Sequence, residues 1–172
     1  MILEKLNLRL ILLHLLAAFF FMLAAKNFSI LTDVEFFEKF SLYGKDKFGE
    51  HLVQDTSVKL NDRIFHALLW MAMFPFIGLF TALIVSILAA RRKKIHLINS
   101  MLMALGGAIL VKTGLLNVHI IKTIASPVSL LVPGLDFGWG YAIDGLLMIA
   151  IGMFVFFSKW TNRLILVKPS SQ

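Results

Sequence analysis

The feature that most constrains the fold of this chain is a run of four cations between two long apolar segments. The run is Arg91-Arg92-Lys93-Lys94, and both flanking segments are strongly apolar. Short loops rich in Lys and Arg stay on the cytoplasmic side of a membrane. The run therefore predicts a hairpin of two transmembrane helices with a cytoplasmic turn. We also expect these four residues to contact anionic lipid headgroups.

The composition favours a membrane protein over a soluble domain. Of the 172 residues, 59% are hydrophobic and 16% are charged, whereas soluble domains have about 45–50% and about 25%. The net charge of +7 would suggest nucleic acid for a soluble protein. Here many of the cations lie beside predicted helix ends on one side, so topology accounts for them and we expect no nucleic-acid partner. The absence of cysteine excludes disulfides and thiolate chemistry.

Four apolar segments predict an all-α integral membrane protein with four transmembrane helices in a single domain, 1–172. The spans are expected at about 10–26, 65–90, 97–121 and 140–158, with an uncleaved first helix. Trp70, Trp139 and Tyr141 would then lie at the outer interface and Trp160 at the inner one, where aromatic residues are enriched. These aromatic positions agree with the orientation that the cations predict. It predicts a multi-pass protein of a bacterial cytoplasmic membrane, with both termini cytoplasmic.

The two remaining segments are expected on the outer side. Residues 27–64 carry mixed charges and predict an ordered outer loop. Within it, Val34, Phe37 and Ser41 recur at helical spacing, which predicts a short amphipathic helix on the membrane surface. Residues 122–139 are apolar but contain Pro127 and Pro133, so they predict an interfacial or re-entrant segment. Such a segment needs protein around its backbone.

Glycines at matched spacing suggest how the last two spans pack. Gly107 and Gly114 in the third span, and Gly145 and Gly152 in the fourth, are each separated by seven residues. If the two helices are antiparallel neighbours, these glycines predict a seam of close approach. Lys112 and His119, also seven apart, would share the opposite, polar face of the third helix.

Ionisable residues within a bilayer are unfavourable, so Lys112 and Asp144 are candidate functional residues. For Lys112 the alternatives are snorkelling to headgroups, an ion pair with Asp144, or lining a pore. For Asp144 we expect a satisfied partner such as Lys112, Tyr141 or the glycine-rich turn at 138–140. The ion pair and the glycine seam exclude each other within one subunit, because the seam turns Lys112 away from the fourth helix.

Histidines at two depths raise the possibility of haem. His14 and His96 lie toward the cytoplasmic side, and His66 and His119 lie toward the outer side. Facing histidines can ligate haem b, and His66 with His119 is the better pair for this. The same two histidines are the candidates for binding a metal ion. His96 and His119 would be about 34 Å apart on one helix, which moves at least one to an interface. We therefore expect no cofactor, with haem as an alternative.

No motif for a catalytic site is present. The chain lacks G-x-S-x-G and H-E-x-x-H, so we assign no catalytic residue and expect no enzymatic activity. The sequence favours a structural or accessory subunit of a membrane complex, whose partners are lipid and other membrane subunits or copies of itself. The alternatives are a homo-oligomeric channel or carrier with a pore lined by Lys112 and His119, and a haem b-binding electron-transfer subunit.

Overall fold

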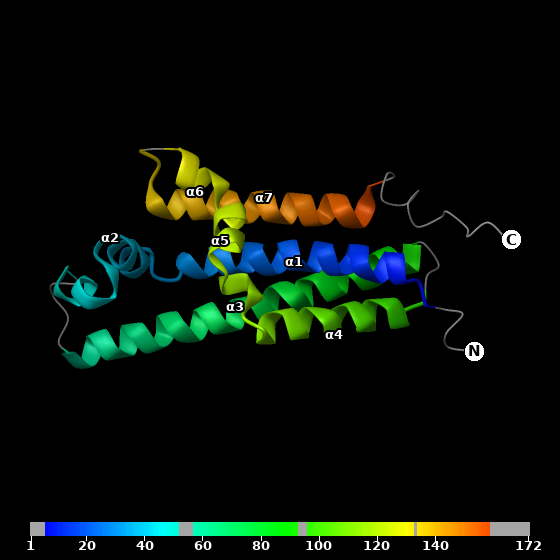
Figure 1. Cartoon of the computed structure of the whole chain (residues 1–172), viewed down its shortest axis with the longest axis horizontal. Helices are drawn as coiled ribbons and strands as arrows, with labels where there is room; N and C mark the ends of the chain where they lie inside the picture. The colour runs from blue at the N-terminus through cyan, green and yellow to red at the C-terminus, as the bar shows by residue number, and fades with distance from the viewer. Residues whose placement is uncertain (1–5, 52–56, 93–95, 133, 159–172) are drawn as a thin grey trace, which may run out of the picture.

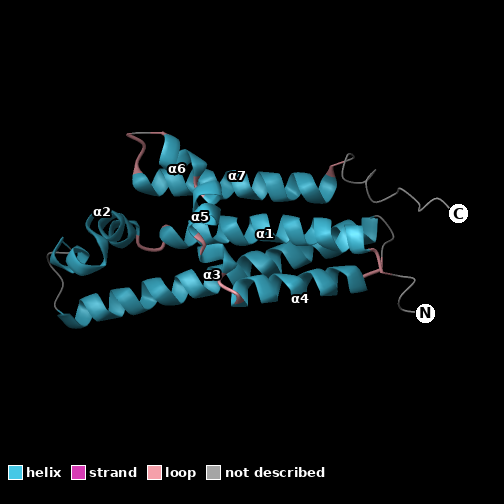
Figure 2. Ribbon diagram, viewed as in Figure 1, coloured by secondary structure: helices cyan, strands magenta, loops and turns pink. Residues whose placement is uncertain are grey.

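The computed structural model describes residues 6–51, 57–92, 96–132 and 134–158, and every regular element in these ranges is a helix (Figures 1 and 2). The predicted all-α class is confirmed. Three helices are long and apolar enough to cross a membrane, as a membrane protein requires: α1 (Leu8–Ile30), α3 (Ser57–Arg92) and α7 (Phe137–Phe157). The 23 residues of α1 measure about 34 Å, against about 30 Å for the hydrocarbon core of a bilayer.

Helix α1 is the centre of the structure. It packs against α3, α7 and α4 (Ile98–Lys112), and Figure 1 shows it between α7 on one side and α3 and α4 on the other. A helix enclosed in this way is apolar around its whole circumference, and α1 carries few polar residues between Leu10 and Ala25. Its buried side chains form one core with residues of the three neighbouring helices, including Leu79, Met103, Met148 and Phe156.

One glycine sets how closely α3 approaches α1. A Cβ atom at Gly78 would lie 2.5 Å from the carbonyl oxygen of Phe21 and 2.8 Å from the Cα atom of Met22. Only a residue without a side chain permits this distance, as at close helix crossings in membranes. The backbones of α1 and α3 are therefore in direct contact at this point.

The third apolar segment does not form the continuous helix predicted over 97–121. Helix α4 ends at Lys112, and Gly114 follows with a φ of 69°, in the left-handed region. A left-handed residue ends an α-helix, and glycine adopts this conformation without steric penalty. The chain continues as the short 3-10 helix η2 (Leu115–Asn117) and then α5 (His119–Ala125). The 15 residues of α4 measure only about 22 Å.

The predicted interfacial segment 122–139 contains two short helices and the beginning of α7. In Figure 1, α5 runs across the bundle from the end of α4 toward α7, where α6 (Pro127–Leu131) packs on α7. Pro127 is the first residue of α6, a position where the missing N–H is not needed. Pro127 therefore begins a short helix here, and Pro133 lies outside the described residues.

Helix α2 (Val34–His51) lies at the end of the bundle where α1 ends and α7 begins (Figure 1). It starts at Val34, where the predicted amphipathic helix starts, and Gly44 interrupts its geometry with a φ of 70°. The buried side chains of Phe36 and Phe37 pack against Ala67 of α3. Helix α2 thus presents Phe36 and Phe37 to the rest of the protein.

Candidate functional site

A cavity of about 740 Å³ lies where α1, α2, α3, α5 and α7 meet. Its lining is mainly apolar and includes the phenylalanines Phe36, Phe37 and Phe40 of α2 and Phe137 of α7. Lys26 and Lys122 also line it, and no Asp or Glu is among the described residues of the lining. Its volume is typical of a site for a small molecule.

Lys26 is positioned by the interruption that follows α4. From α1, its ammonium donates to the carbonyl oxygen of Leu116 and, at 2.6 Å, to Oδ1 of Asn117. The carbonyl oxygen of Leu116 lies in the 3-10 turn beyond the end of α4, where the α-helix offers it no hydrogen-bond donor. Lys26 supplies that donor. From the sequence, Lys26 is predicted only to end the first span, 10–26. The signal available was a cation at the end of an apolar helix.

Lys122 reaches the cavity because α1 also holds α5. Asn27 Nδ2 donates to the carbonyl oxygen of Ala125 at 2.7 Å, and Ser126 Oγ donates to Asn27 Oδ1 at 3.4 Å. Asn27 is buried, so these bonds satisfy polar groups that would otherwise be unfavourable. Lys122 lies about one turn before Ala125 and is exposed. Two cations from distant parts of the sequence thus line one cavity.

Asp144 is fully buried and binds the backbone of α6. Its two carboxylate oxygens accept hydrogen bonds from Val128 N at 2.8 Å and Ser129 N at 3.0 Å. The first N–H groups of a helix have no partner within that helix, and Asp144 supplies one from α7. The ion pair with Lys112, one of the alternatives, is not formed within this chain, because Asp144 binds these N–H groups and Lys112 is exposed at the end of α4. The carboxylate instead fixes α6 on α7.

The predicted glycine seam between the third and fourth helices is not formed, because α1 lies between them. Gly107 faces Leu79 of α3, and Gly145 and Gly152 face aromatic rings of α1. Gly114 is at the helix interruption. The glycines of α7 do permit close packing, but with α1.

His14 belongs to a buried hydrogen-bonded chain that joins three helices. His14 Nδ1 and Ser86 Oγ are 2.8 Å apart, and Ser86 Oγ donates to Ser100 Oγ at 2.8 Å. These residues come from α1, α3 and α4, and all three are buried. The ring of His14 also meets Phe156 of α7 edge-on, with the centroids 4.8 Å apart. His14 and the two serines therefore link α1, α3 and α4, and the contact with Phe156 adds α7.

The remaining candidate residues do not converge. Lys112 ends α4 and His119 begins α5, so the interruption between them abolishes the common helix face that the spacing predicted. His66 on α3, His96 and His119 are exposed. Among the described residues, no group of three or more His, Asp or Glu side chains could hold a metal ion. A haem pair of His66 and His119 stays a prediction.

The described part of the basic cluster lies at the end of the bundle opposite α2. Arg91 and Arg92 are exposed, and the guanidinium of Arg92 lies 5.9 Å from the ring centroid of Phe157 at the end of α7. At this same end Asn7 N donates to Asn99 Oδ1 at 3.0 Å, joining the beginnings of α1 and α4. Lys93 and Lys94 lie outside the described residues.

Comparison with known proteins does not assign a role to this geometry. No protein-family model, curated protein sequence or solved structure matches the chain.

Proposed function

We propose that this multi-pass membrane protein acts as a small accessory subunit of a larger membrane complex and not as an enzyme. The observation that carries the proposal is the interruption between α4 and α5. The backbone leaves the α-helix after Lys112 and passes through a left-handed residue and a 3-10 turn. Non-helical backbone at membrane depth is tolerated only where protein or a water-filled cavity surrounds it.

The hydrogen bonds of Lys26 support a position of this interruption within the membrane. Lys26 donates to the carbonyl oxygen of Leu116 and lies about one turn before the end of α1, which ends at Ile30. The 3-10 turn is therefore level with the last turns of a helix long enough to cross a bilayer. We count α4 together with this turn as the fourth crossing.

The surface beside the interruption is strongly apolar. We define the α5–α6 surface as Ile120, Ile124, Leu130 and Leu131, whose side chains are all exposed, Ile120 by 68% and Leu131 by 78%. Lipid tails can cover apolar side chains but offer no hydrogen-bonding groups to an irregular backbone. A neighbouring subunit can provide both kinds of contact. We therefore propose that a second copy or another subunit covers the α5–α6 surface.

The charges support an orientation with both termini in the cytoplasm. Arg91 and Arg92 lie at the end of the bundle that holds the beginning of α1 and the end of α7. Asp33 and Glu35 lie at the opposite end, with α2. The positive-inside rule favours the arginine end as cytoplasmic. We extend the proposal to a bacterial cytoplasmic membrane, with α2 on the outer side.

The lack of cysteine permits a direct test with single-cysteine variants. Ile120→Cys and Leu131→Cys, labelled with a benzophenone maleimide and irradiated in native membranes, should cross-link to another protein. Phe80→Cys on α3 and Phe154→Cys on α7 are matched controls, since these side chains are 64% and 62% exposed on continuous helices. Cross-links at the control positions alone, or only to lipid at all four, would contradict the proposal.

Two alternatives have their own readouts. A homo-oligomeric channel or carrier that uses Lys112 and His119 predicts ion flux into liposomes that changes in Lys112→Met. A haem b subunit that uses His66 and His119 predicts a Soret band in the purified protein, lost in His119→Ala.

A further inference from the structure

We propose that the cavity between α1, α2, α3, α5 and α7 binds one phosphate-bearing lipid of the surrounding membrane. The lipid chain lies among the apolar side chains of α2 and α3, and the phosphate lies at Lys26 and Lys122. This inference is independent of the proposed role in a complex. It rests on the shape, charge and position of the cavity.

The apolar part of the cavity suits a lipid chain. Phe36 and Phe37 of α2 and Ala67 and Met71 of α3 line it, and the first three of these residues are buried. A volume of about 740 Å³ exceeds what a headgroup alone would fill, since sites for whole drug-sized molecules occupy about 300–1,000 Å³. The cavity therefore has room for part of an acyl or isoprenoid chain.

The charge of the lining favours an anion. Lys26 and Lys122 both line the cavity, and the part of the lining that the structure describes contains no Asp or Glu. Two cations beside an apolar space of low polarity repel each other more strongly than in water. A bound anion offsets this repulsion, and basic pockets between transmembrane helices bind lipid phosphates for this reason.

The arrangement of donors favours a phosphate over a single carboxylate. An ammonium has three N–H groups, and the bonds of Lys26 to Leu116 and Asn117 use two. Lys122 comes from α5, and Tyr141 of α7 also lines the cavity. Donors from several elements suit an anion with several oxygens. The cavity lies at the last turn of α1, just inside the level of the headgroups of one leaflet, so a lipid of that leaflet can reach it.

The first test is native mass spectrometry of the delipidated protein in a mild non-ionic detergent. Phosphatidylglycerol, phosphatidylcholine and oleate are added separately at the same concentrations. We expect one tightly held phosphatidylglycerol, weaker binding of zwitterionic phosphatidylcholine and still weaker binding of oleate. Lys122→Ala should weaken phosphatidylglycerol binding about tenfold, the effect of losing one hydrogen bond to a charged group. Lys112→Ala, which removes an exposed lysine away from the cavity, should leave binding unchanged.

A second pair of variants tests the cavity itself. Ala67→Phe places a ring in the space for the chain and should weaken binding of phosphatidylglycerol and phosphatidylcholine alike. Ala150→Phe, at an exposed position of α7, is its control. An unchanged thermal unfolding temperature in Lys122→Ala establishes that this variant is folded. Equal binding of all three amphiphiles, equal effects of Lys122→Ala and Lys112→Ala, or no retained lipid would overturn the proposal.

Discussion

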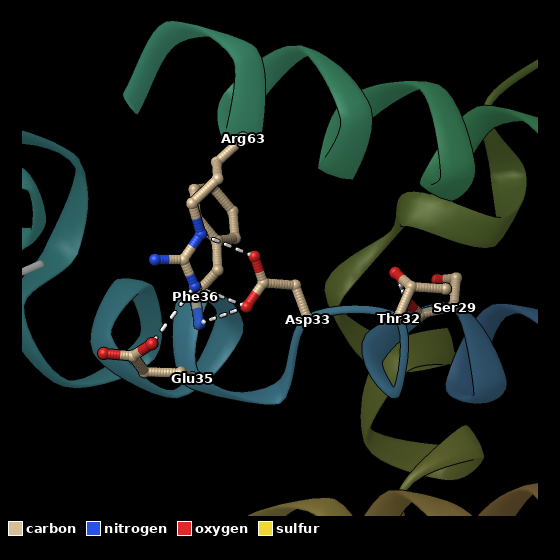
Figure 3. Close-up of polar contacts among 6 residues, drawn as sticks. All are labelled: Ser29, Thr32, Asp33, Glu35, Phe36 and Arg63. Atoms are coloured by element: carbon tan, nitrogen blue, oxygen red, sulfur yellow. Dashed lines mark hydrogen bonds and ion pairs between the residues drawn. The ribbon is translucent and has the colours of Figure 1, made fainter. Parts of the chain in front are cut away.

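Arg63 of α3 binds Asp33 through two hydrogen bonds, with Nε donating to Oδ2 at 2.8 Å and Nη2 donating to Oδ1 at 2.7 Å (Figure 3). Asp33 Oδ1 also accepts from Phe36 N at 3.2 Å, in the first turn of α2. Paired bonds between a guanidinium and a carboxylate are among the stronger polar contacts in proteins. One carboxylate thus holds both the beginning of α2 and its position on α3.

Asp33→Ala should loosen α2 from α3. It removes the paired hydrogen bonds and a helix cap, and each kind of interaction contributes about 1 kcal/mol. We expect a loss of about 1–2 kcal/mol of unfolding free energy, measured by chemical denaturation in detergent. Glu35→Ala is the control, because Glu35 receives one bond from Arg63, at 3.2 Å, and is more exposed. Equal effects of the two substitutions would show that the paired geometry does not matter.

The same residue predicts a dependence on pH. Partial burial raises the pKa of Asp33, but the hydrogen bonds from Arg63 and Phe36 N and the charge of Arg63 outweigh it, so that the pKa lies below its ordinary value. A carboxylate with a lowered pKa in the folded state stabilises the protein above its unfolded-state pKa. This contribution is lost as the pH falls below about 4, through the folded-state pKa.

The measurement is the unfolding temperature of the wild-type protein and Asp33→Asn between about pH 3 and 7. The difference between the two proteins should be constant at neutral pH and shrink at the acidic end. A difference that grows with acidity would contradict the direction of the pKa shift.

Gly78→Ala should separate α3 from α1. Its Cβ atom would lie 2.5 Å from a backbone oxygen of α1, so the helices must move. Overpacking of this kind destabilises a protein by about 1–3 kcal/mol. Gly106→Ala is the matched control, because its Cβ atom would lie 3.2 Å from the flexible end of Leu15. Unfolding free energies in detergent should therefore fall for Gly78→Ala and change little for Gly106→Ala.

Ser86→Ala should weaken the chain that joins α1, α3 and α4. Ser86 Oγ contacts both His14 and Ser100. Hydrogen bonds between membrane helices contribute on average about 0.6 kcal/mol and at most about 1.7 kcal/mol, so we expect a loss of about 1 kcal/mol in the same measurement. Thr81→Ala, whose exposed hydroxyl bonds to Ile77 of its own helix, should have a smaller effect. The reverse order would show that the buried chain does not stabilise the bundle.

The sequence predicted the long helices well because their signal is local. Apolar length identifies α1, α3 and α7, and the helical spacing from Val34 located the beginning of α2. Charge patterns placed Arg91 and Arg92 at a helix end, where the structure has them. None of these predictions depended on which helices are neighbours.

The predictions from sequence failed for features that depend on which helices pack against each other. The glycine seam assumed that the third and fourth helices are neighbours, but α1 occupies the space between them and its Phe21 and Phe28 face the glycines of α7. Gly114 was read as a packing residue, although its left-handed conformation ends a helix. Asp144 was expected to have a satisfied partner such as Lys112, Tyr141 or the turn at 138–140, and its partners are backbone N–H groups of α6. A single sequence does not show that the first turn of a short helix packs against a buried carboxylate.

Local sequence patterns also do not predict the cavity, because its lining residues come from distant parts of the sequence. All of α2, α3 and α4 lies between Lys26 and Lys122 in the sequence. Only the passage of α5 across α1 brings both lysines to the cavity. Lys112 and His119 were predicted to share one helix face because they are seven residues apart. The helix interruption between them removed the basis for that pairing.

Native mass spectrometry of the protein released from its own membrane in mild detergent tests the proposed role in a complex most directly. If the protein is a subunit of a complex, we expect a species heavier than one chain of 19.4 kDa. Its mass should be an integer multiple of that value or should include other proteins. The α5–α6 surface should lie in its interface, so that Ile120→Asp reduces the heavier species while Phe80→Asp does not. A chain that is released from its membrane only as a 19.4 kDa monomer would contradict the account.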